Sequence, residues 1–320
     1  MKFLVTGGAG FIGSNLVHSL LANGHKIRVL DNFSTGRHEN LDGIESRIEI
    51  LEGYIRDFAT VAQAVLGMDV VLHLAALPSV PRSVKDPLTS HEVNITGTLN
   101  VLEASRQADV KKVVSASSSS VYGESEVLPK HEKMELQPLS PYAVTKLTGE
   151  YYCRVYWELF KLPTVSLRYF NVFGPRQNPE GDYAAVIPKF IKALLNNEKP
   201  LVYGDGGQSR DFTYIENAIQ ANILAATTEK IVGTEYNVAC GGEFTLNQLL
   251  EELRNIIGSD IAANYEKSRA GDIRRSFADI SKLKVHGYRP TINFRQGLEK
   301  TVDYFQALHS SPKSVTKVNR

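Results

Sequence analysis

The sequence predicts an α/β fold in which a doubly wound parallel sheet is covered by helices on both faces. The first observation is that short apolar runs alternate with helical patterns, an order that builds parallel sheets. The second is that these runs are apolar throughout, as strands buried on both faces require. The third is composition, since 42% hydrophobic and 22% charged residues among 320 supply enough apolar material for a large core.

A regular alternation of strands and helices fills the first half of the chain. Residues 3–5 form the first expected strand, which stops at glycines, and the helical pattern that follows ends near Gly24. A second strand is expected at residues 27–30. Later strands are expected at residues 48–51, 70–74, 112–116 and 164–168, with helices between them at 58–66, 92–108 and 142–161.

The pattern changes after about residue 171. Loops rich in Gly, Pro and Asn then separate helices expected near 186–196, 216–228 and 245–257. Two domains are therefore predicted: a first over residues 1–170, with a returning segment near 213–240, and a smaller mixed α/β domain over 171–310. Residues 311–320 carry three positive charges and no acids, which predicts a disordered tail.

Composition excludes several classes of function. The net charge of +1 argues against binding to nucleic acid or to an anionic membrane. Two cysteines, Cys153 and Cys240, are too few for a disulfide framework or a zinc cluster, so no metal site is expected and a reducing compartment fits best. No signal-peptide core or membrane-spanning run is present in the sequence. We therefore expect a cytoplasmic protein.

A glycine-rich turn lies where the first strand should meet the first helix. Residues 6–13 read Thr-Gly-Gly-Ala-Gly-Phe-Ile-Gly, so Gly7, Gly10 and Gly13 fall three apart. Glycine at such positions allows a tight turn, a close approach of the backbone to a pyrophosphate, and packing of the helix on the strand. The triplet alone would also suit a turn without a ligand.

Asp31 gives this turn a context. It ends the second strand, 18 residues after Gly13. A carboxylate there can accept hydrogen bonds from the adenosine ribose and repels a 2′-phosphate. Together the turn, the helix and the strand predict a Rossmann-type dinucleotide-binding domain that favours NAD over NADP, although Arg37 follows only six residues later.

A tyrosine and a lysine are the candidate catalytic pair. Tyr142 and Lys146 lie four apart at the start of an expected helix and so share one face of it. A nearby cation favours the phenolate and should lower the tyrosine pKa. Serines 117–120 follow an apolar strand at the edge of the sheet where chemistry gathers. Either pattern alone is common, on amphipathic helices or in polar turns.

Several motifs together resemble one known family. The glycine turn, His73-Leu74-Ala75-Ala76, Ser118 four residues before Tyr122-Gly123, and the Tyr142–Lys146 pair together resemble the extended short-chain dehydrogenase/reductase family. The segments Arg-Tyr-Phe-Asn-Val-Phe-Gly (168–174), Arg-Asp-Phe (210–212) and Arg-Ala-Gly-Asp (269–272) are similar to its UDP-hexose 4-epimerase branch. The resemblance runs from about residue 2 to residue 305.

The resemblance implies a mechanism and partners. Tyr142 would remove the proton of the sugar 4-hydroxyl while C4 gives a hydride to NAD. Lys146 would hold the nicotinamide ribose and depress the tyrosine pKa, and Ser118 would hydrogen-bond the 4-oxygen. The 4-keto sugar would then turn over and take the hydride back on its other face, so NAD would stay tightly bound. A UDP-sugar substrate and a homodimer built through helices 92–108 and 142–161 are also implied.

The family's binding positions map onto this chain. Arg210 and Arg269 would grip the UDP diphosphate with guanidinium forks, although either alone would also suit a surface ion pair. Tyr54 departs from the pattern, since the family has an aspartate there that meets adenine. The cofactor positions are Gly7, Gly10, Phe11, Ile12, Gly13, Asp31, Asn32, Ser34, Gly36, Ile55, Leu74, Ala75, Ala76, Asn94, Tyr142, Lys146 and Phe170. The substrate positions are Pro78, Ser118, Ser119, Asn171, Ala185, Val186, Val202, Tyr203, Arg210, Arg269, Asp272 and Ser276.

The sugar specificity is inferred from the residues that wall the sugar site in this branch. Enzymes confined to plain glucose and galactose have a tyrosine at the position of Ser276, so the serine leaves room for an N-acetyl group. Interconversion of UDP-GlcNAc and UDP-GalNAc is therefore expected, with UDP-glucose and UDP-galactose as further substrates. UDP-glucuronate 4-epimerase is the alternative. A non-catalytic NAD-binding protein is disfavoured because Tyr142 and Lys146 remain, and decarboxylases and dehydratases because Ser120 stands where they have an acid.

Overall fold

Neighbouring residues of the first strand face two different cores. In β1 (Lys2–Thr6), Phe3 and Val5 join one apolar cluster, and Leu4 joins another on the opposite face. All three side chains are fully buried. Because strand side chains alternate between faces, this sheet must be covered on both sides.

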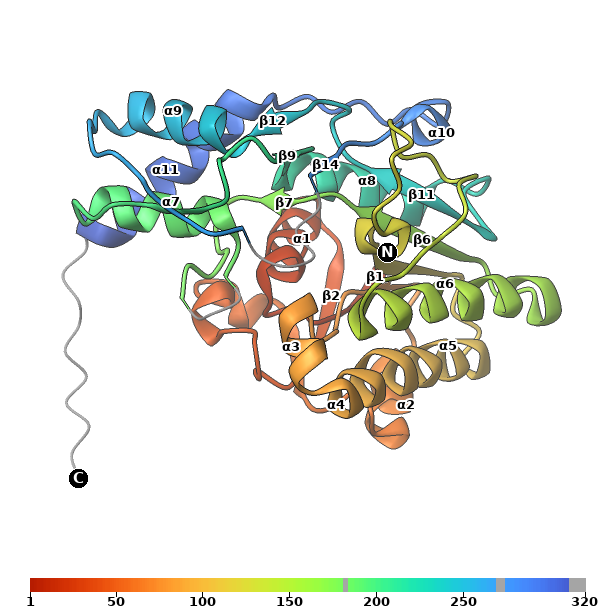
Figure 1. Ribbon diagram of the computed structural model, residues 1–320. Helices are drawn as coiled ribbons and strands as arrows, with labels where there is room; N and C mark the ends of the chain where they lie inside the picture. Colours follow the sequence, from red (N-terminus) through yellow and green to blue (C-terminus); the bar gives the residue numbers. More distant parts are fainter. Residues whose placement is uncertain (181–183, 269–273, 311–320) are drawn as a thin grey trace.

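Seven parallel strands make the central sheet of the computed structural model, which describes residues 1–180, 184–268 and 274–310 (Figure 1). The strand order is β11-β6-β5-β4-β1-β2-β3, and every neighbouring pair is parallel. The direction of the winding reverses between β1 and β4, and ligands of such sheets bind beyond the carboxyl ends of the strands at this point. The expected fold class is confirmed. The strands after β1 are β2 (Lys26–Asp31), β3 (Glu49–Glu52), β4 (Val70–His73), β5 (Lys112–Ser118), β6 (Thr164–Tyr169) and β11 (Thr234–Val238).

Helices cover the two faces of the sheet. Side chains of α1 (Phe11–Ala22) and α8 (Ile215–Thr227) enter the cluster that contains Phe3. Those of α2 (Phe58–Val65), α5 (Gly97–Gln107) and α6 (Pro141–Phe160) enter the cluster that contains Leu4, and Figure 1 shows α5 and α6 side by side. The α6 helix begins after Ser140, whose side chain accepts a hydrogen bond from the Ala143 N–H.

A π-helical turn interrupts the helix expected at residues 92–108. The turn spans Glu92–Thr96 and α5 follows it directly. The wider turn carries Asn94, which is 2% exposed. Such π turns often occur at functional sites. The expected helical stretch at residues 92–108 is present, and its π-helical first turn was not predicted because apolar spacing does not register a local change of helical pitch.

Small sheets and helices make up the rest of the described chain. The segment after β10 returns to the central sheet, where β11 pairs with β6, and the division of domains at residue 170 stays a prediction. The strand β9 (Ser209–Arg210) lies between β12 (Phe244–Thr245) and β14 (Arg275–Ser276). The remaining strands are β7 (Val172–Phe173) with β10 (Thr213–Tyr214), and β8 (Leu201–Tyr203) with β13 (Asn264–Glu266). The other helices are α3 (Val80–Lys85), α4 (Pro87–His91), α7 (Val186–Leu195), α9 (Leu246–Ile257), α10 (Ser281–Lys284) and α11 (Phe294–Ser310), with short 3-10 turns at His38–Leu41, Glu45–Arg47 and Ser119–Tyr122.

Within the described ranges, no helix combines the length and the apolar character that crossing a bilayer demands. The expected tail at residues 311–320 lies outside the described residues.

Candidate active site and nucleotide-binding loop

The glycine turn between β1 and α1 has no room for larger residues. Gly7 has a φ of +70°, and a Cβ there would lie 2.7 Å from the backbone nitrogen of Ala75. A Cβ on Gly13 would overlap the carbonyl oxygen of Gly7. Gly10 precedes α1 without a side-chain cap, so the amino end of the helix is left to backbone N–H groups. Such a cradle of backbone fits a pyrophosphate.

The end of β2 meets this turn through Asp31. Its Oδ2 accepts a hydrogen bond from the Ala9 N–H at 2.9 Å, and its Oδ1 accepts one from the Phe33 N–H at 2.9 Å. Burial raises the pKa of Asp31, and these backbone hydrogen bonds act in the opposite direction. A Cβ on Gly36 would lie 3.0 Å from Asp31 Oδ2, so glycine keeps space beside the carboxylate. These contacts leave Asp31 fixed beside the glycine turn, where a ribose hydroxyl could donate to it.

Ser118, Tyr142 and Lys146 come together where β5 meets α6. Lys146 Nζ lies 5.9 Å from the centroid of the Tyr142 ring and donates a hydrogen bond to the carbonyl oxygen of Ala116 at 2.9 Å. Ser118 forms a side-chain hydrogen bond with Tyr142 that lowers the tyrosine pKa. Ser83 of α3 accepts the Tyr142 N–H at 3.0 Å, which holds the first turn of α6. The strand end, the helix and α3 therefore fix the three side chains together.

Desolvation dominates the electrostatics of the pair. It raises the pKa of Tyr142 to about 12, against the smaller effect of the Ser118 hydrogen bond. It lowers the pKa of Lys146 to about 8, while Cys153 and Glu150 act to raise it. The sequence-based expectation of a lowered tyrosine pKa is therefore wrong for this structure, because crowding by protein atoms disfavours the phenolate more than its neighbours favour it.

A chain of buried hydrogen bonds supports the loop that follows β4. The Ala75 N–H donates to Thr6 Oγ1, which lies 2.8 Å from His73 Nδ1, and His73 Nε2 lies 3.0 Å from Thr98 Oγ1. Thr98 Oγ1 in turn donates to the Asn94 carbonyl oxygen at 2.6 Å. Burial lowers the pKa of His73 to about 3, so the ring is neutral, and this order of donors places its proton on Nε2.

Asn94 joins this loop to the catalytic helix. Its Oδ1 accepts the Leu77 N–H at 2.8 Å, and its Nδ2 donates to Thr145 Oγ1 at 3.0 Å. Thr145 lies between Tyr142 and Lys146 in α6. Sequence reasoning assigned Asn94 to the cofactor, whereas here its side chain is engaged within the protein. Ser83 and Thr145 were not singled out from the sequence, since hydroxyl residues carry no spacing signal of their own.

The candidate substrate residues on β9 and β14 lie side by side. Ser276 is paired in register with Arg210, and Ser276 is 7% exposed. Asp211 follows Arg210, and its carboxylate accepts N–H groups from Cys240 at 3.0 Å and Gly241 at 2.9 Å. This carboxylate therefore ties the strand that carries Arg210 to the segment after β11.

Other predicted residues occupy several elements. Arg269 and Asp272 lie outside the described residues, so their predicted roles are not addressed by the structure. Of the remaining cofactor residues, Phe11 and Ile12 begin α1, Asn32 and Ser34 form a hydrogen bond after β2, and Ile55 is buried after β3. Leu74 to Ala76 and the exposed Pro78 follow β4, Ser119 begins a 3-10 turn, and the buried Phe170 and then Asn171 follow β6. Ala185 and Val186 lie at the start of α7, and Val202 and Tyr203 lie on β8.

The fold and this arrangement define a dinucleotide-dependent enzyme of the doubly wound α/β class. The chain belongs to the NAD dependent epimerase/dehydratase family, whose pattern matches residues 3–239. It is 39% identical over 311 residues to the UDP-glucose 4-epimerase of Mycolicibacterium smegmatis, covering 96% of this chain and 99% of that protein.

Solved structures with similar folds agree with this membership. The UDP-N-acetylglucosamine 4-epimerase from Methanobrevibacter ruminantium, in complex with UDP-N-acetylmuramic acid, has a TM-score of 0.92 and 42% identity, covering 96% of this chain and 98% of that one. The UDP-glucose 4-epimerase of Thermus thermophilus, in complex with NAD, has a TM-score of 0.88 and 39% identity, covering 96% and 99% of the two chains.

Proposed function

We propose that this enzyme is an NAD-dependent 4-epimerase of UDP-hexoses that interconverts UDP-GlcNAc and UDP-GalNAc, and also UDP-glucose and UDP-galactose. The observation that carries the proposal is the joining of Ser118, Tyr142 and Lys146 at the carboxyl end of β5. In the same sheet, β4 lies between β5 and β1, the strand that leads into the glycine turn. A base, a cation and a hydroxyl in this arrangement can remove and return one proton while the cofactor exchanges a hydride.

Each of the three side chains has a proposed role. NAD, held by the glycine turn and Asp31, would supply the redox chemistry, namely the exchange of a hydride with C4 of the sugar. Tyr142, as the phenolate, would take the proton of the 4-hydroxyl and, as the phenol, would later return it. Ser118 Oγ hydrogen-bonds the 4-oxygen, and its bond to Tyr142 lowers the tyrosine pKa. Lys146, fixed by the Ala116 carbonyl, holds the nicotinamide ribose, and its positive charge favours the phenolate.

The glycine turn and Asp31 are proposed to hold the cofactor. Gly7, Gly10 and Gly13 let the backbone approach the pyrophosphate, and Asp31 accepts from the adenosine ribose. A carboxylate at this place repels a 2′-phosphate, so NAD is favoured over NADP. Among the substrate residues, Arg210 is proposed to bind the UDP diphosphate.

The small residue Ser276 supports the N-acetylated sugars. Its register with Arg210 places it beside the proposed diphosphate residue, and its hydroxyl side chain is far smaller than the tyrosine of enzymes confined to plain hexoses. The 42% identical relative from Methanobrevibacter ruminantium is named for UDP-N-acetylglucosamine. Both observations favour a site that admits the N-acetyl group.

We also propose that the protein is a cytoplasmic homodimer. Apolar side chains on the outer face of α6 are exposed, including Tyr151 at 53% and Leu159 at 70%. An exposed apolar stripe of this kind suits pairing with a second copy through α5 and α6. Cys153 and Cys240 are free thiols, which suits a reducing compartment.

The test uses purified protein, UDP-GlcNAc and no added NAD, followed by proton NMR of the sugar. Appearance of UDP-GalNAc supports the epimerase, the retained cofactor and the open sugar site together. Conversion of UDP-galactose alone would keep the mechanism and overturn the sugar assignment. If neither substrate turns over even with NAD supplied, turnover of UDP-glucuronate would establish the alternative substrate, and its absence would leave a non-catalytic protein.

A further inference from the structure

A third ionisable residue, Glu150, lies one helical turn beyond the catalytic pair on α6. Glu150 follows Lys146 by four residues, as Lys146 follows Tyr142, so the three share one helical face. Consecutive residues at the end of β5 hold them: the Ala116 carbonyl accepts from Lys146 Nζ, Ser117 Oγ donates to Glu150 Oε1, and Ser118 bonds Tyr142. Sequence reasoning ended at Lys146 and did not extend the spacing of four to Glu150.

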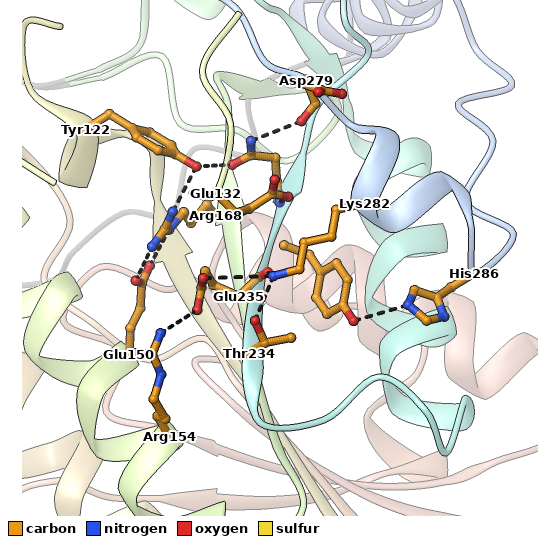
Figure 2. A network of polar contacts seen from close by, with 12 residues as sticks. Tyr122, Glu132, Glu150, Arg154, Arg168, Thr234, Glu235, Asp279, Lys282 and His286 are labelled. Carbon is orange, nitrogen blue, oxygen red and sulfur yellow. Dashed lines mark hydrogen bonds and ion pairs between the residues drawn. The ribbon is translucent and has the colours of Figure 1, made fainter. Parts of the chain in front are cut away.

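Glu150 is itself fixed by a buried ion pair. Arg168 of β6 grips it with two hydrogen bonds, at 2.8 Å to Oε1 and 2.7 Å to Oε2, and the two side chains are 2% and 5% exposed. Arg168 also donates to the Tyr122 hydroxyl at 2.9 Å (Figure 2). Tyr122 donates in turn to Asn237 of β11. A carboxylate held by so many partners is retained at a defined place next to Lys146.

Other titratable groups near Lys146 are neutral where it titrates. Burial raises the pKa of the Cys153 thiol to about 11, and it lowers the pKa of the His73 ring to about 3. Tyr142, with its pKa raised to about 12, is also neutral at that pH. Charged residues on other elements packed against α6 contact other parts of this helix or are exposed. Glu103 of α5 accepts a hydrogen bond from Tyr156, and Glu235 of β11 accepts one from Arg154. Lys85, His91 and Glu92 are exposed, and Arg82 of α3 is half-buried. Glu150, which is paired with Arg168, is therefore the carboxylate that acts with Cys153 to raise the pKa of Lys146.

We propose that Glu150 is a positioning residue for the proposed epimerase: fixed by Arg168 and Ser117 one helical turn beyond Lys146, it keeps the Lys146 ammonium charged at the place where the Ala116 carbonyl holds it. The inference rests on the proposed function only in assigning Lys146 a role in turnover. Desolvation works against the Lys146 charge, and the Glu150 carboxylate acts to raise the pKa of Lys146. An opposite charge within about 4–6 Å changes a pKa by about 1–3 units, and the Arg168 charge offsets part of this effect.

The test compares Glu150→Gln with Glu235→Gln. Glu235 is a matched control, since it is also a largely buried carboxylate of this region, paired with Arg154 and 3.9 Å from Lys282 (Figure 2). Unlike Glu150, it is not among the groups that change the pKa of Lys146. In Glu150→Gln, the fall of kcat at alkaline pH should move down by about one pH unit, which is about a tenfold loss of rate on that limb. In Glu235→Gln, the alkaline limb should coincide with that of the unaltered enzyme.

A second measurement does not depend on turnover. Carbon-13 labelling of lysine Cε lets the Lys146 titration be followed by NMR, with the resonance assigned by its loss in Lys146→Met. Glu150→Gln should lower the midpoint of this titration, and Glu235→Gln should not. If Arg168 left unpaired prevents folding, the double variant Glu150→Gln/Arg168→Gln leaves neither charge buried alone and should show a smaller downward shift, because the positive charge of Arg168 is removed as well.

The outcomes separate this inference from the proposed function. An unaltered enzyme that fails to epimerise any UDP-sugar counts against the proposed function, while the NMR titration still decides the role of Glu150. A Lys146 midpoint and an alkaline limb that are the same in Glu150→Gln and in the unaltered enzyme would overturn the inference. Loss of kcat with an unmoved pH profile would assign Glu150 a structural role only.

Discussion

Replacing Gly7 with alanine tests whether the glycine turn serves the cofactor. Gly7 has a φ of +70°, a conformation that costs an alanine about 1–2 kcal/mol. The added Cβ would also lie 2.7 Å from the Ala75 nitrogen and 2.9 Å from its Cα, against ordinary contact from 3.4 Å. The backbone segments must therefore separate by about 0.7 Å, and overpacking of this kind costs a further 1–3 kcal/mol or so.

Gly24→Ala is the matched control for this change. Gly24 has a φ of +77° and nothing within 4 Å of an added Cβ, so it incurs the backbone cost alone. We expect Gly7→Ala to lose about 2–5 kcal/mol in urea unfolding and Gly24→Ala about 1–2 kcal/mol. NAD released on denaturation, measured per chain, should fall sharply in Gly7→Ala and stay unchanged in Gly24→Ala. Equal losses of stability together with full NAD retention in Gly7→Ala would refute the reasoning.

Three further predictions concern turnover. Tyr142→Phe should lower kcat by about 10²–10⁴-fold while the NAD content stays the same, because only the proton acceptor is removed; unchanged kcat in a steady-state assay would contradict its role. Ser276→Tyr should lower kcat/KM for UDP-GlcNAc by about 100-fold or more and spare UDP-galactose, and equal loss with both sugars would argue against the open site. Since the pKa of Lys146 is lowered to about 8, kcat should fall as the pH rises above about 8 and the ammonium loses its proton. The arginine of Lys146→Arg stays charged, so the activity of this variant should persist to higher pH. If kcat falls at the same alkaline pH in Lys146→Arg and in the unaltered enzyme, Lys146 is not the cause of that fall.

Local patterns in the sequence were sufficient for the fold class and for the first candidates, the glycine turn and the Tyr142–Lys146 pair, whereas most other candidate residues came from the family resemblance. The glycine spacing at 7, 10 and 13 and the four-residue step from Tyr142 to Lys146 are short-range features, since each depends on one turn or one helix. The apolar strands likewise predict a two-sided sheet, because alternation and burial act residue by residue. The roles of these residues in binding and catalysis stay predictions.

Only the tertiary structure decided what surrounds these residues. Ser118 reaches Tyr142, and Ser117 and Arg168 reach Glu150, because β5, β6 and α6 pack together from distant parts of the chain. The pKa of Tyr142 follows the same rule: the sequence shows the nearby lysine, but the desolvation that raises the pKa comes from atoms of many segments. Burial and long-range partners are properties of the folded chain, so the sequence by itself determined the groups available for chemistry, and the packing determined their charge and position.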